Sequence, residues 1–306
     1  MAFAKALGYQ PNSLARGLRT SRSYTLGIAV PQLENPVFPE IILGAETAAR
    51  ARGYSLLISH SGDASGDTRN YEQLASVSRV DGLLVATLED DVPLTRSLAR
   101  TSLPFVVLNR KLAGIENHVV FDSFGAAKLA TEHLLSLSHR RIAHLAGRER
   151  GYNGIRRLAG YRNALEAAGI AFDENLVVAG GYTFEGGELA MRELLARSDQ
   201  PSAVVAATLL TAAGALKVLH AQKVRVPEQM SVVGIHDAAL ADMLHPPLTT
   251  VRLPLHEMGA SATRGLIDLI EGKCGHVATT LAPERLVLRE STAPPPRIRR
   301  RHAASR

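Results

Sequence analysis

The sequence contains a single cysteine, Cys274, among its 306 residues. One cysteine excludes an internal disulfide and a metal cluster held by several thiolates, and it fits a reducing compartment. The sequence also lacks any apolar run that approaches the ~20 residues of a membrane-spanning helix. Its first residues lack the apolar core and cleavage site of a secretory signal. These absences predict a cytoplasmic protein that does not contact a membrane.

Acidic residues are absent from both ends of the chain, where basic residues are concentrated. The ends, residues 1–24 and 293–306, carry nine Lys and Arg side chains, whereas the rest carries 26 basic and 29 acidic ones. This asymmetry suggests contact with a polyanion, because basic side chains displace counterions from phosphates. The C-terminal segment has three consecutive prolines and no apolar pattern, so a basic, disordered tail over 293–306 is the simpler interpretation there.

Sequence motifs of common catalytic sites are absent as well. The chain contains no GxSxG elbow, HExxH pair or P-loop, and no GxGxxG followed by an acidic residue. His133, His139 and His144 fall on a predicted helix, turn and strand, which is poor geometry for metal ligands, and we expect them to be structural or on the surface. We therefore predict a protein that is not an enzyme and has no cofactor and no metal site.

From Tyr24 onward, short apolar segments alternate with helical segments, a pattern typical of parallel βαβ units. The length suffices for two domains with separate cores. In the first half the pattern predicts strands at 24–30, 54–59, 81–86, 104–109 and 118–121, with helices near 38–52, 67–78 and 92–100. In the second half it predicts strands at 141–147, 175–179, 202–207 and 230–235, with helices near 123–138, 155–168, 183–196 and 209–221.

A final helix at 255–271 and a late strand at 285–289 are surplus to this scheme. They can cross back, the helix to the first lobe and the strand to the second. Two parallel sheets joined by several crossings of the chain would form a two-lobed body with a cleft between the lobes. Ligands of open α/β sheets bind at the carboxyl ends of the strands. We therefore expect a site in the loops that follow 24–30, 81–86, 104–109, 141–147, 202–207 and 230–235.

PNSLARGLRTSRSYTLGIAVP, followed by ENPVFPEIILGAE, resembles the lac repressor (LacI/GalR) family of bacterial transcription regulators. The resemblance extends to about residue 292 through RVDGLLV, PFVVLNR, RRLAGYRNAL, VPEQMSVVGIHD and PPLTTVRLP, in the family's order. It implies an α/β fold of two Rossmann-like lobes with parallel sheets and multiple crossovers, like a type I periplasmic binding protein. It also implies a preceding helix-turn-helix and hinge helix, dimerisation, and a small effector, often a sugar or nucleobase, that controls DNA affinity.

The resemblance implies three segments. Residues 1–23 correspond to the end of the DNA-binding headpiece and the hinge helix, 24–292 to the effector-binding body, and 293–306 to the tail. Within the body, we expect lobe 1 at about 24–122 and 254–283, and lobe 2 at about 123–252 and 284–292.

Pro11 to Arg19 match the hinge helix, and the resemblance places Asn12, Ala15, Arg16, Leu18 and Arg19 at DNA. Leu18 would wedge between base pairs, because an apolar wedge kinks the duplex while basic side chains follow the minor groove. The alternative is that Leu18 packs on the body. MAFAKALGY matches only the end of the headpiece's third helix. We expect a fragment or a misassigned start, with loss of sequence-specific DNA reading as the alternative. The chain as it stands is not expected to bind an operator specifically.

The family pattern also marks candidate effector contacts. In the first lobe these are Asn35, Phe38, Asn109, Arg110 and Asp122. Phe38 can stack on a sugar or base or pack at the start of its helix, and Asp122 can contact the effector or cap the following helix.

In the second lobe the candidates are Asn153, Arg157, Thr208, His236 and Asp237. Arg157 matches an arginine whose planar fork clamps hydroxyls or a carboxylate. Thr208 and Leu209 stand where the family usually has Asn-Asp, and His236 stands where it usually has an aspartate. A pocket with fewer acceptors suggests a smaller, more apolar or anionic effector instead of a plain hexose. Loss of effector sensing is the alternative.

These observations predict a DNA-binding transcriptional regulator, expected to be a repressor, whose effector binds between the two lobes. The effector would be a sugar, a sugar derivative or an anionic metabolite. Operator DNA is the expected partner of the full-length protein, and a homodimer through the outer faces of the lobes is the expected assembly. A stand-alone small-molecule binding protein without DNA binding is the alternative.

Overall fold

The computed structural model describes residues 22–60, 80–86, 95, 96, 98 and 100–296. Unit 1 comprises the chain up to Val120 together with Leu255–Thr280, and unit 2 comprises Phe121–Pro254 together with the chain from Leu281 onward. Both are α/β units built on mainly parallel sheets, which confirms the predicted fold class. The hinge residues, the helix predicted near 67–78, most of the helix near 92–100 and the tail from 297 lie outside the described residues.

Unit 1 is built on a sheet whose strand order, within the described residues, is β11-β5-β4-β3-β1-β2. β1 pairs in parallel with β2 and β3, and the parallel pairing continues through β4 to β5. Most of these strands are buried on both faces, which explains why they appear in the sequence as continuous apolar runs. The strands are β1 (Thr25–Val30), β2 (Ser55–His60), β3 (Gly82–Ala86), β4 (Phe105–Leu108), β5 (His118–Phe121) and β11 (Ala278–Leu281).

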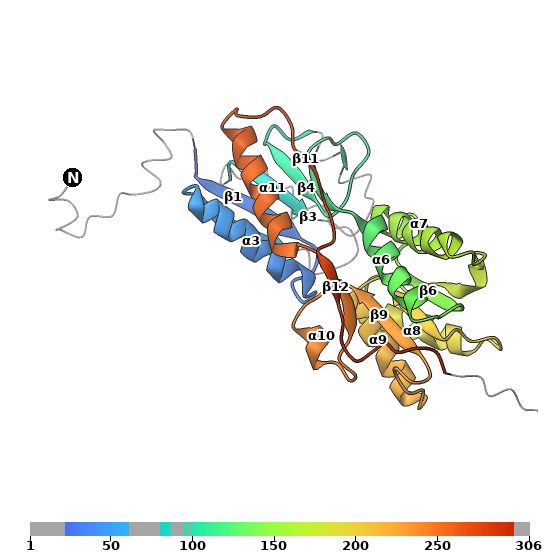
Figure 1. Ribbon diagram of the computed structural model, residues 1–306. Coiled ribbons are helices and arrows are strands. Elements are labelled where there is room, and N and C mark those ends of the chain that lie inside the picture. The colour runs from blue at the N-terminus through green and yellow to red at the C-terminus, as the bar shows by residue number, and fades with distance from the viewer. Residues whose placement is uncertain (1–21, 61–79, 87–94, 97, 99, 297–306) are drawn as a thin grey trace, which may run out of the picture. The chain divides into compact units, whose positions relative to one another are not determined.

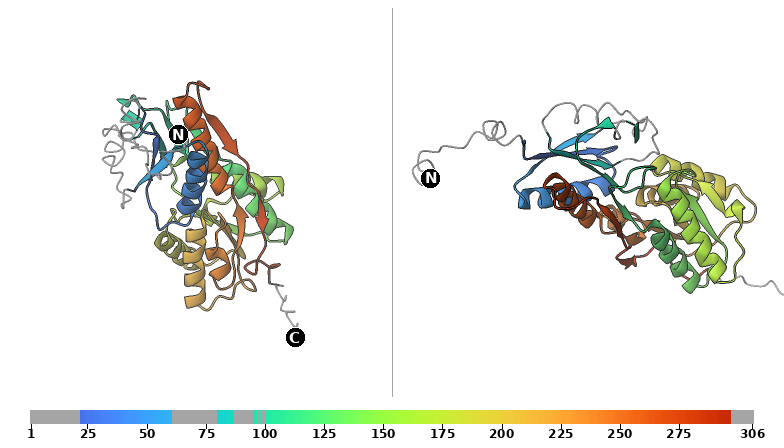
Figure 2. Two further views of the ribbon diagram at one scale, coloured as in Figure 1. Left: turned by 90° about the vertical axis from the view of Figure 1, so that its left-hand side faces the viewer. Right: turned by 90° about the horizontal axis from the view of Figure 1, so that it is seen from above.

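Helices α3 (Val37–Ala51) and α11 (Leu255–Ile270) belong to unit 1 and pack closely against each other. Figure 1 and both views of Figure 2 show them side by side, although some 200 residues separate them in the chain. Two glycines permit this approach. A side chain on Gly44 would collide with the main-chain carbonyl of His256, and one on Gly259 would collide with that of Ile41. The helix predicted at 255–271 therefore does cross back to the first unit.

Unit 2 is built on a sheet of order β12-β10-β9-β8-β6-β7, again within the described residues. Its strands pair in parallel, except that β12 runs antiparallel to β10. The strands are β6 (Ile142–Ala146), β7 (Val177–Ala179), β8 (Ala203–Ala206), β9 (Ser231–Ile235), β10 (Thr249–Arg252) and β12 (Arg285–Val287). The longer helices are α6 (Ser123–Ser136), α7 (Tyr152–Ala167), α8 (Phe184–Leu195) and α9 (Leu209–Ala221).

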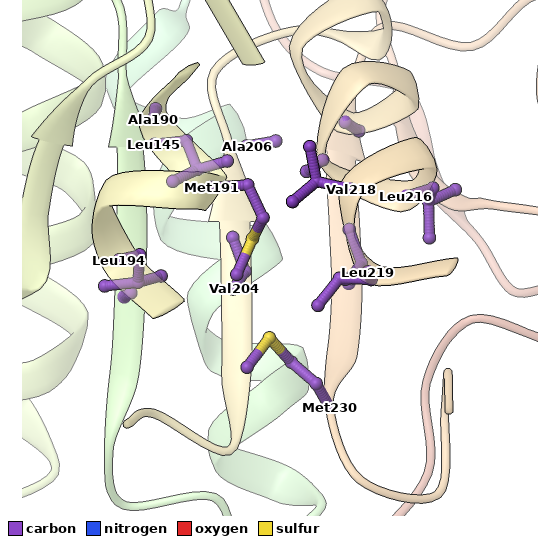
Figure 3. Close-up of a cluster of buried hydrophobic side chains, with 14 of the residues drawn as sticks. Leu145, Ala190, Met191, Leu194, Val204, Ala206, Leu216, Val218, Leu219 and Met230 are labelled. Atoms are coloured by element: carbon purple, nitrogen blue, oxygen red, sulfur yellow. The ribbon is translucent and has the colours of Figure 1, made fainter. Parts of the chain in front are cut away.

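The two-residue period of the strands divides these helices between the faces of the sheet. Leu145 on β6 and Val204 on β8 belong to an apolar core that also contains Met191 of α8 and Leu219 of α9. Figure 3 shows the side chains of these two helices around β8. His144, which points to the other face of β6, stacks on Tyr161 of α7 with ring centroids 5.2 Å apart. The C-terminal ends of β6, β8 and β9 are thus held between two helical layers.

The sequence pattern missed four short elements: β10, β11, the helix α10 (Leu240–Met243) and a 3₁₀ turn at Glu174–Leu176. The turn occupies the start of the strand predicted at 175–179, because Asp173 Oδ1 accepts a hydrogen bond from the main-chain nitrogen of Asn175 at 2.9 Å. Hydrogen bonds also join Ala293 to unit 2. Its main-chain oxygen accepts hydrogen bonds from His139 and Ser231.

Candidate functional site

The carboxyl ends of β6 and β8 are neighbours in the sheet of unit 2, and the chain leaves them in opposite directions. β6 leads through α7 to β7 on one side, whereas β8 leads through α9 to β9 on the other. In an open parallel sheet, such a switch point is where ligands bind. Gly147 and Ala207 directly follow the two strands. Of the sequence-predicted residues, Arg157, Thr208 and His236 lie at this edge.

Arg157 extends from the second turn of α7 and is 1% exposed. Its Nη1 donates to the main-chain oxygen of Ala207 at 2.7 Å, and its Nη2 lies 3.2 Å from His236 Nε2. Its Nε has no hydrogen-bond partner. Burial lowers the pKa of Arg157, and within the described part of the chain no carboxylate pairs with it. A buried cation without a counter-ion is unfavourable, so this position favours a ligand that supplies acceptor atoms or negative charge.

His236 follows β9 with a φ of 74°, in the left-handed region that few non-glycine residues adopt. It is 4% exposed. A guanidinium has no acceptor, so His236 Nε2 must accept from Arg157, which leaves the proton on Nδ1. Burial, reinforced by the charge of Arg157, holds the pKa of His236 well below its usual value. The ring is therefore neutral, and its Nδ1–H has no hydrogen-bond partner.

Tyr182, in the loop after β7, is a further residue of this site that sequence reasoning missed. Its ring centroid lies 5.8 Å from Arg157 Cζ, within the range of a cation–π contact. Its buried Oη has no hydrogen-bond partner. The ring lies directly over Gly147, where a side-chain Cβ would come within 2.7 Å of Oη. The GGY sequence alone resembles an ordinary turn, so only the packing on Gly147 identifies the tyrosine.

Asp237, in contrast, is fully engaged by neighbouring side chains. It accepts hydrogen bonds from Thr250 Oγ1 at 2.7 Å and Arg252 Nε at 2.8 Å, and Arg289 Nη1 lies 2.8 Å from its Oδ1. Burial raises the pKa of Asp237, but these hydrogen bonds and charges lower it by more, so the net pKa lies below its ordinary value. The carboxylate joins the end of β9 to β10 and to the segment after β12.

The remaining second-lobe candidates stabilise helices. Thr208 is the N-cap of α9, because its Oγ1 accepts from the main-chain nitrogen of Thr211 at 3.1 Å. Asn153, in the first turn of α7, accepts a hydrogen bond from Ser123 Oγ at 2.9 Å and so joins α7 to α6. Both side chains are buried. No observation tests their predicted contact with an effector.

In unit 1, the candidates follow two strands at the carboxyl edge of the sheet. Asn35 comes after β1, and its side chain accepts from the main-chain nitrogen of Val37 at 3.2 Å, which starts α3. Phe38 is buried within α3. Asn109 follows β4 with a φ of 68°, and Arg110 beside it is buried. Their effector contacts remain predictions.

Asp122 caps α6, as one of the two sequence interpretations expected. Its Oδ1 accepts from the main-chain nitrogen of Gly125 at 3.0 Å, and Arg156 Nη2 lies 3.9 Å from the same carboxylate. A role in effector binding is not tested by this geometry. The hinge candidates Asn12, Ala15, Arg16, Leu18 and Arg19 lie outside the described residues.

The three histidines considered as metal ligands make separate hydrogen bonds within unit 2. His144 donates from Nδ1 to the main-chain oxygen of Val205 at 2.9 Å, His133 Nε2 lies 3.0 Å from Thr292 Oγ1, and His139 holds Ala293. The described residues contain no group of three or more His, Cys, Asp or Glu side chains placed to hold a metal. Nor does any described helix have the length and apolar character that crossing a membrane requires.

Comparison with known proteins gives concordant results. Residues 131–292 match the family model of the periplasmic binding protein-like domain. The chain is 38% identical to the HTH-type transcriptional regulator CelR of Thermobifida fusca over 295 residues, covering 94% of this chain and 86% of that protein. It is 33% identical to the ribose operon repressor of Escherichia coli, covering 94% of this chain and 86% of the repressor.

Solved structures agree with these relatives. The CelR–cellobiose complex superposes with a TM-score of 0.80 at 36% identity, covering 94% of this chain and 88% of the other. A LacI family regulator from Mycobacterium smegmatis superposes with a TM-score of 0.83 at 33% identity, covering 88% of this chain and 99% of the other. Identity at this level over nearly the whole chain, together with the shared fold, confirms the resemblance seen in the motifs. The chain belongs to the LacI family of transcriptional regulators.

Proposed function

We propose that this chain is the effector-responsive body of a DNA-binding transcriptional repressor, and that a small molecule at the Arg157 site controls its affinity for operator DNA. Buried Arg157 carries the proposal. It is held at the switch point of the unit 2 sheet by Ala207, it contacts the neutral His236 and the ring of Tyr182, and no described carboxylate pairs with it. A guanidinium, an imidazole N–H and a phenol hydroxyl in such an arrangement can bind a ligand through hydrogen bonds.

The relatives support a sugar-like effector. The CelR structure is titled as a complex with cellobiose, and other relatives are named as ribose operon repressors. These ligands belong to those proteins, and here they support an effector of similar size that carries several hydroxyl groups. The relatives are named as regulators, which supports a binding role in the cytoplasm and a partner that is operator DNA. We also propose that the chain acts as a homodimer.

An effector can shift DNA affinity only if it binds one conformation of the protein more tightly than another. A coupling free energy of about 1–3 kcal/mol would change DNA affinity by roughly 5- to 150-fold. Arg157 suits this task, because α7 carries its backbone while its guanidinium is bonded to the ends of β8 and β9. A ligand that binds the guanidinium therefore contacts a group linked to three elements at once.

Chromatin immunoprecipitation of the native protein, expressed from its own locus, tests the proposal by measuring which DNA fragments it binds. Discrete promoter fragments should be enriched, and deletion of the gene should raise transcription from those promoters. Uniform recovery of genomic DNA, with unchanged transcription in the deletion strain, would contradict the proposal.

A further inference from the structure

The polar atoms without partners around Arg157 include two that can only donate hydrogen bonds. Arg157 Nε, His236 Nδ1 and Tyr182 Oη are buried and have no hydrogen-bond partner. Of these, the first two are N–H groups that cannot accept, because the tautomer of His236 is set by its bond from Arg157. A tyrosine hydroxyl can donate or accept. The ligand must therefore provide acceptors.

Two carboxylates that adjoin these elements in the chain are already bonded to other cations. Asp237, adjacent in the chain to His236, is held by Arg252 and Arg289. Asp122 caps α6 and faces Arg156. Neither is paired with Arg157, so the counter-ion of this guanidinium has to come from outside the described side chains. A neutral sugar would add no negative charge to this site.

The charge at the site also limits the charge of the ligand. Arg157 contributes one positive charge, and neutral His236 contributes none. A carboxylate balances this charge with a single negative one and presents two oxygens to the planar fork of the guanidinium. A phosphate ester carries about −1.5 to −2 at neutral pH, and the excess would be buried against low-dielectric walls. The balance favours a carboxylate.

We propose that the Arg157 site selects an effector with a carboxylate group, and that sugar acids are the ligand class of this regulator. The inference rests on the proposed function, because it concerns the ligand of the same site. Arg157 binds the carboxylate through its Nε edge, and the Nδ1–H of His236 and the hydroxyl of Tyr182 donate to oxygens of the same ligand. His236, whose neutral ring places no negative charge beside Arg157, is the position that sets the preference for acidic over neutral sugars.

Isothermal titration calorimetry of the full chain with matched ligands tests this selection. The pairs are glucose and glucuronate, galactose and galacturonate, and cellobiose and cellobionate, with glucose 6-phosphate as the phosphate probe. At least one acid should bind with a Kd about 10- to 100-fold below that of its neutral partner, the usual effect of a hydrogen bond to a charged group. Equal or tighter binding of the neutral partners would overturn the proposal. Tighter binding of the phosphate, or no binding of any acid at millimolar concentration, would also overturn it.

Two substitutions at His236 distinguish the effect of a negative charge beside Arg157 from the effect of a change in side-chain shape. His236→Asp places a carboxylate beside Arg157, and Asp tolerates the left-handed backbone of this position. The ion pair between the introduced carboxylate and Arg157 should weaken binding of the sugar acid at least tenfold. It should also remove the preference for the sugar acid over the neutral sugar. His236→Asn leaves the charge balance unchanged and should keep the preference. Arg162→Gln, on the exposed side of α7, is the control that should bind like the wild type.

Failure of the carboxylate preference can be distinguished from failure of the proposed regulatory function. If a neutral sugar binds and releases the protein from its promoter DNA, the regulatory role stands and the carboxylate preference falls. If a sugar acid binds with the expected preference while promoter occupancy is unchanged, the ligand class stands and the regulatory role falls. Calorimetry and immunoprecipitation thus report on separate claims.

Discussion

Replacing Gly259 with alanine should destabilise unit 1, because α11 lies against α3 at this residue. The added Cβ would lie 2.9 Å from the carbonyl carbon of Ile41 and 2.8 Å from the main-chain nitrogen of Ala45. Carbon atoms in contact are normally about 3.5 Å or more apart, so relieving the contact with the carbonyl carbon alone needs roughly 0.6 Å, and relieving the closer clash with the carbonyl oxygen of Ile41 needs more. Both obstructing groups are main chain within a helix, and neither can rotate away.

A gap of this size removes about a quarter to a half of the dispersion energy of the atoms along the contact. Overpacking of a core typically costs about 1–3 kcal/mol or more, whereas alanine gains roughly 1 kcal/mol over glycine in helix propensity. We expect a net loss of about 2 kcal/mol. For a unit of this size, that corresponds to a melting temperature lower by roughly 4–8 °C. Thermal unfolding followed by circular dichroism measures the change.

Gly265→Ala is the matched control on the same helix. There the three atoms nearest to the added Cβ all belong to the side chain of Val277 and none to the main chain, so the loss should be smaller and the gain in helix propensity should offset more of it. The reasoning would be refuted if Gly259→Ala were as stable as the wild type. It would equally be refuted if the two alanine variants lost the same amount.

Buried charges and exposed apolar side chains lead to three further expectations. Burial lowers the pKa of His144 to about 4, below its value in the unfolded chain, so unit 2 should lose up to about 3 kcal/mol between pH 6.5 and 4. Urea unfolding at pH 5 and pH 7 should show a smaller difference in His144→Gln. Asp237→Asn should cost about 3–5 kcal/mol at pH 7, and this loss should shrink below about pH 4, where the unfolded chain and then the native carboxylate take up protons. Melting curves across that range measure it, and an unchanged loss would contradict the ion network. Leu43 and Met243, 55% and 77% exposed, are the most exposed large apolar side chains described in their units, and mutation of either to Glu should dissociate the proposed homodimer in sedimentation velocity. A wild-type chain that sediments as a monomer at micromolar concentration would rule the dimer out.

The central strands of both sheets could be predicted from the sequence because they are buried on both faces. Residues 118–121 coincide with β5, and the helix predicted at 209–221 coincides with α9. Strands β10 and β11 could not be predicted in this way. TTVR lies between prolines, and ATTL alternates exposed and partly exposed residues, so neither has an apolar run of its own. Such strands depend on pairing with distant neighbours, and local sequence does not reveal the partner.

In the candidate site, too, some features could be predicted from local sequence and others depend on residues that are distant in the chain. Arg157 was predicted from its motif, but its partners Ala207 and His236 are 50 and 79 residues away in the chain, and only the folded sheet brings them together. Asp237 was predicted as an effector contact, which stays a prediction, and the sequence did not reveal its bonds to Arg252 and Arg289. An aspartate that binds a ligand and one that pairs with an internal cation look the same in a sequence. The difference depends on long-range neighbours.

The most direct test of the central claim is the DNA affinity of the native protein with and without an effector at Arg157. Fluorescence anisotropy on an immunoprecipitated promoter fragment should show a shift in Kd of roughly 5- to 150-fold when a ligand from the calorimetric panel is added. The Arg157→Met variant, which lacks the guanidinium, should bind the same fragment without that shift, while Arg162→Gln should retain it. A ligand that binds at Arg157 and leaves the Kd for DNA unchanged would contradict the account.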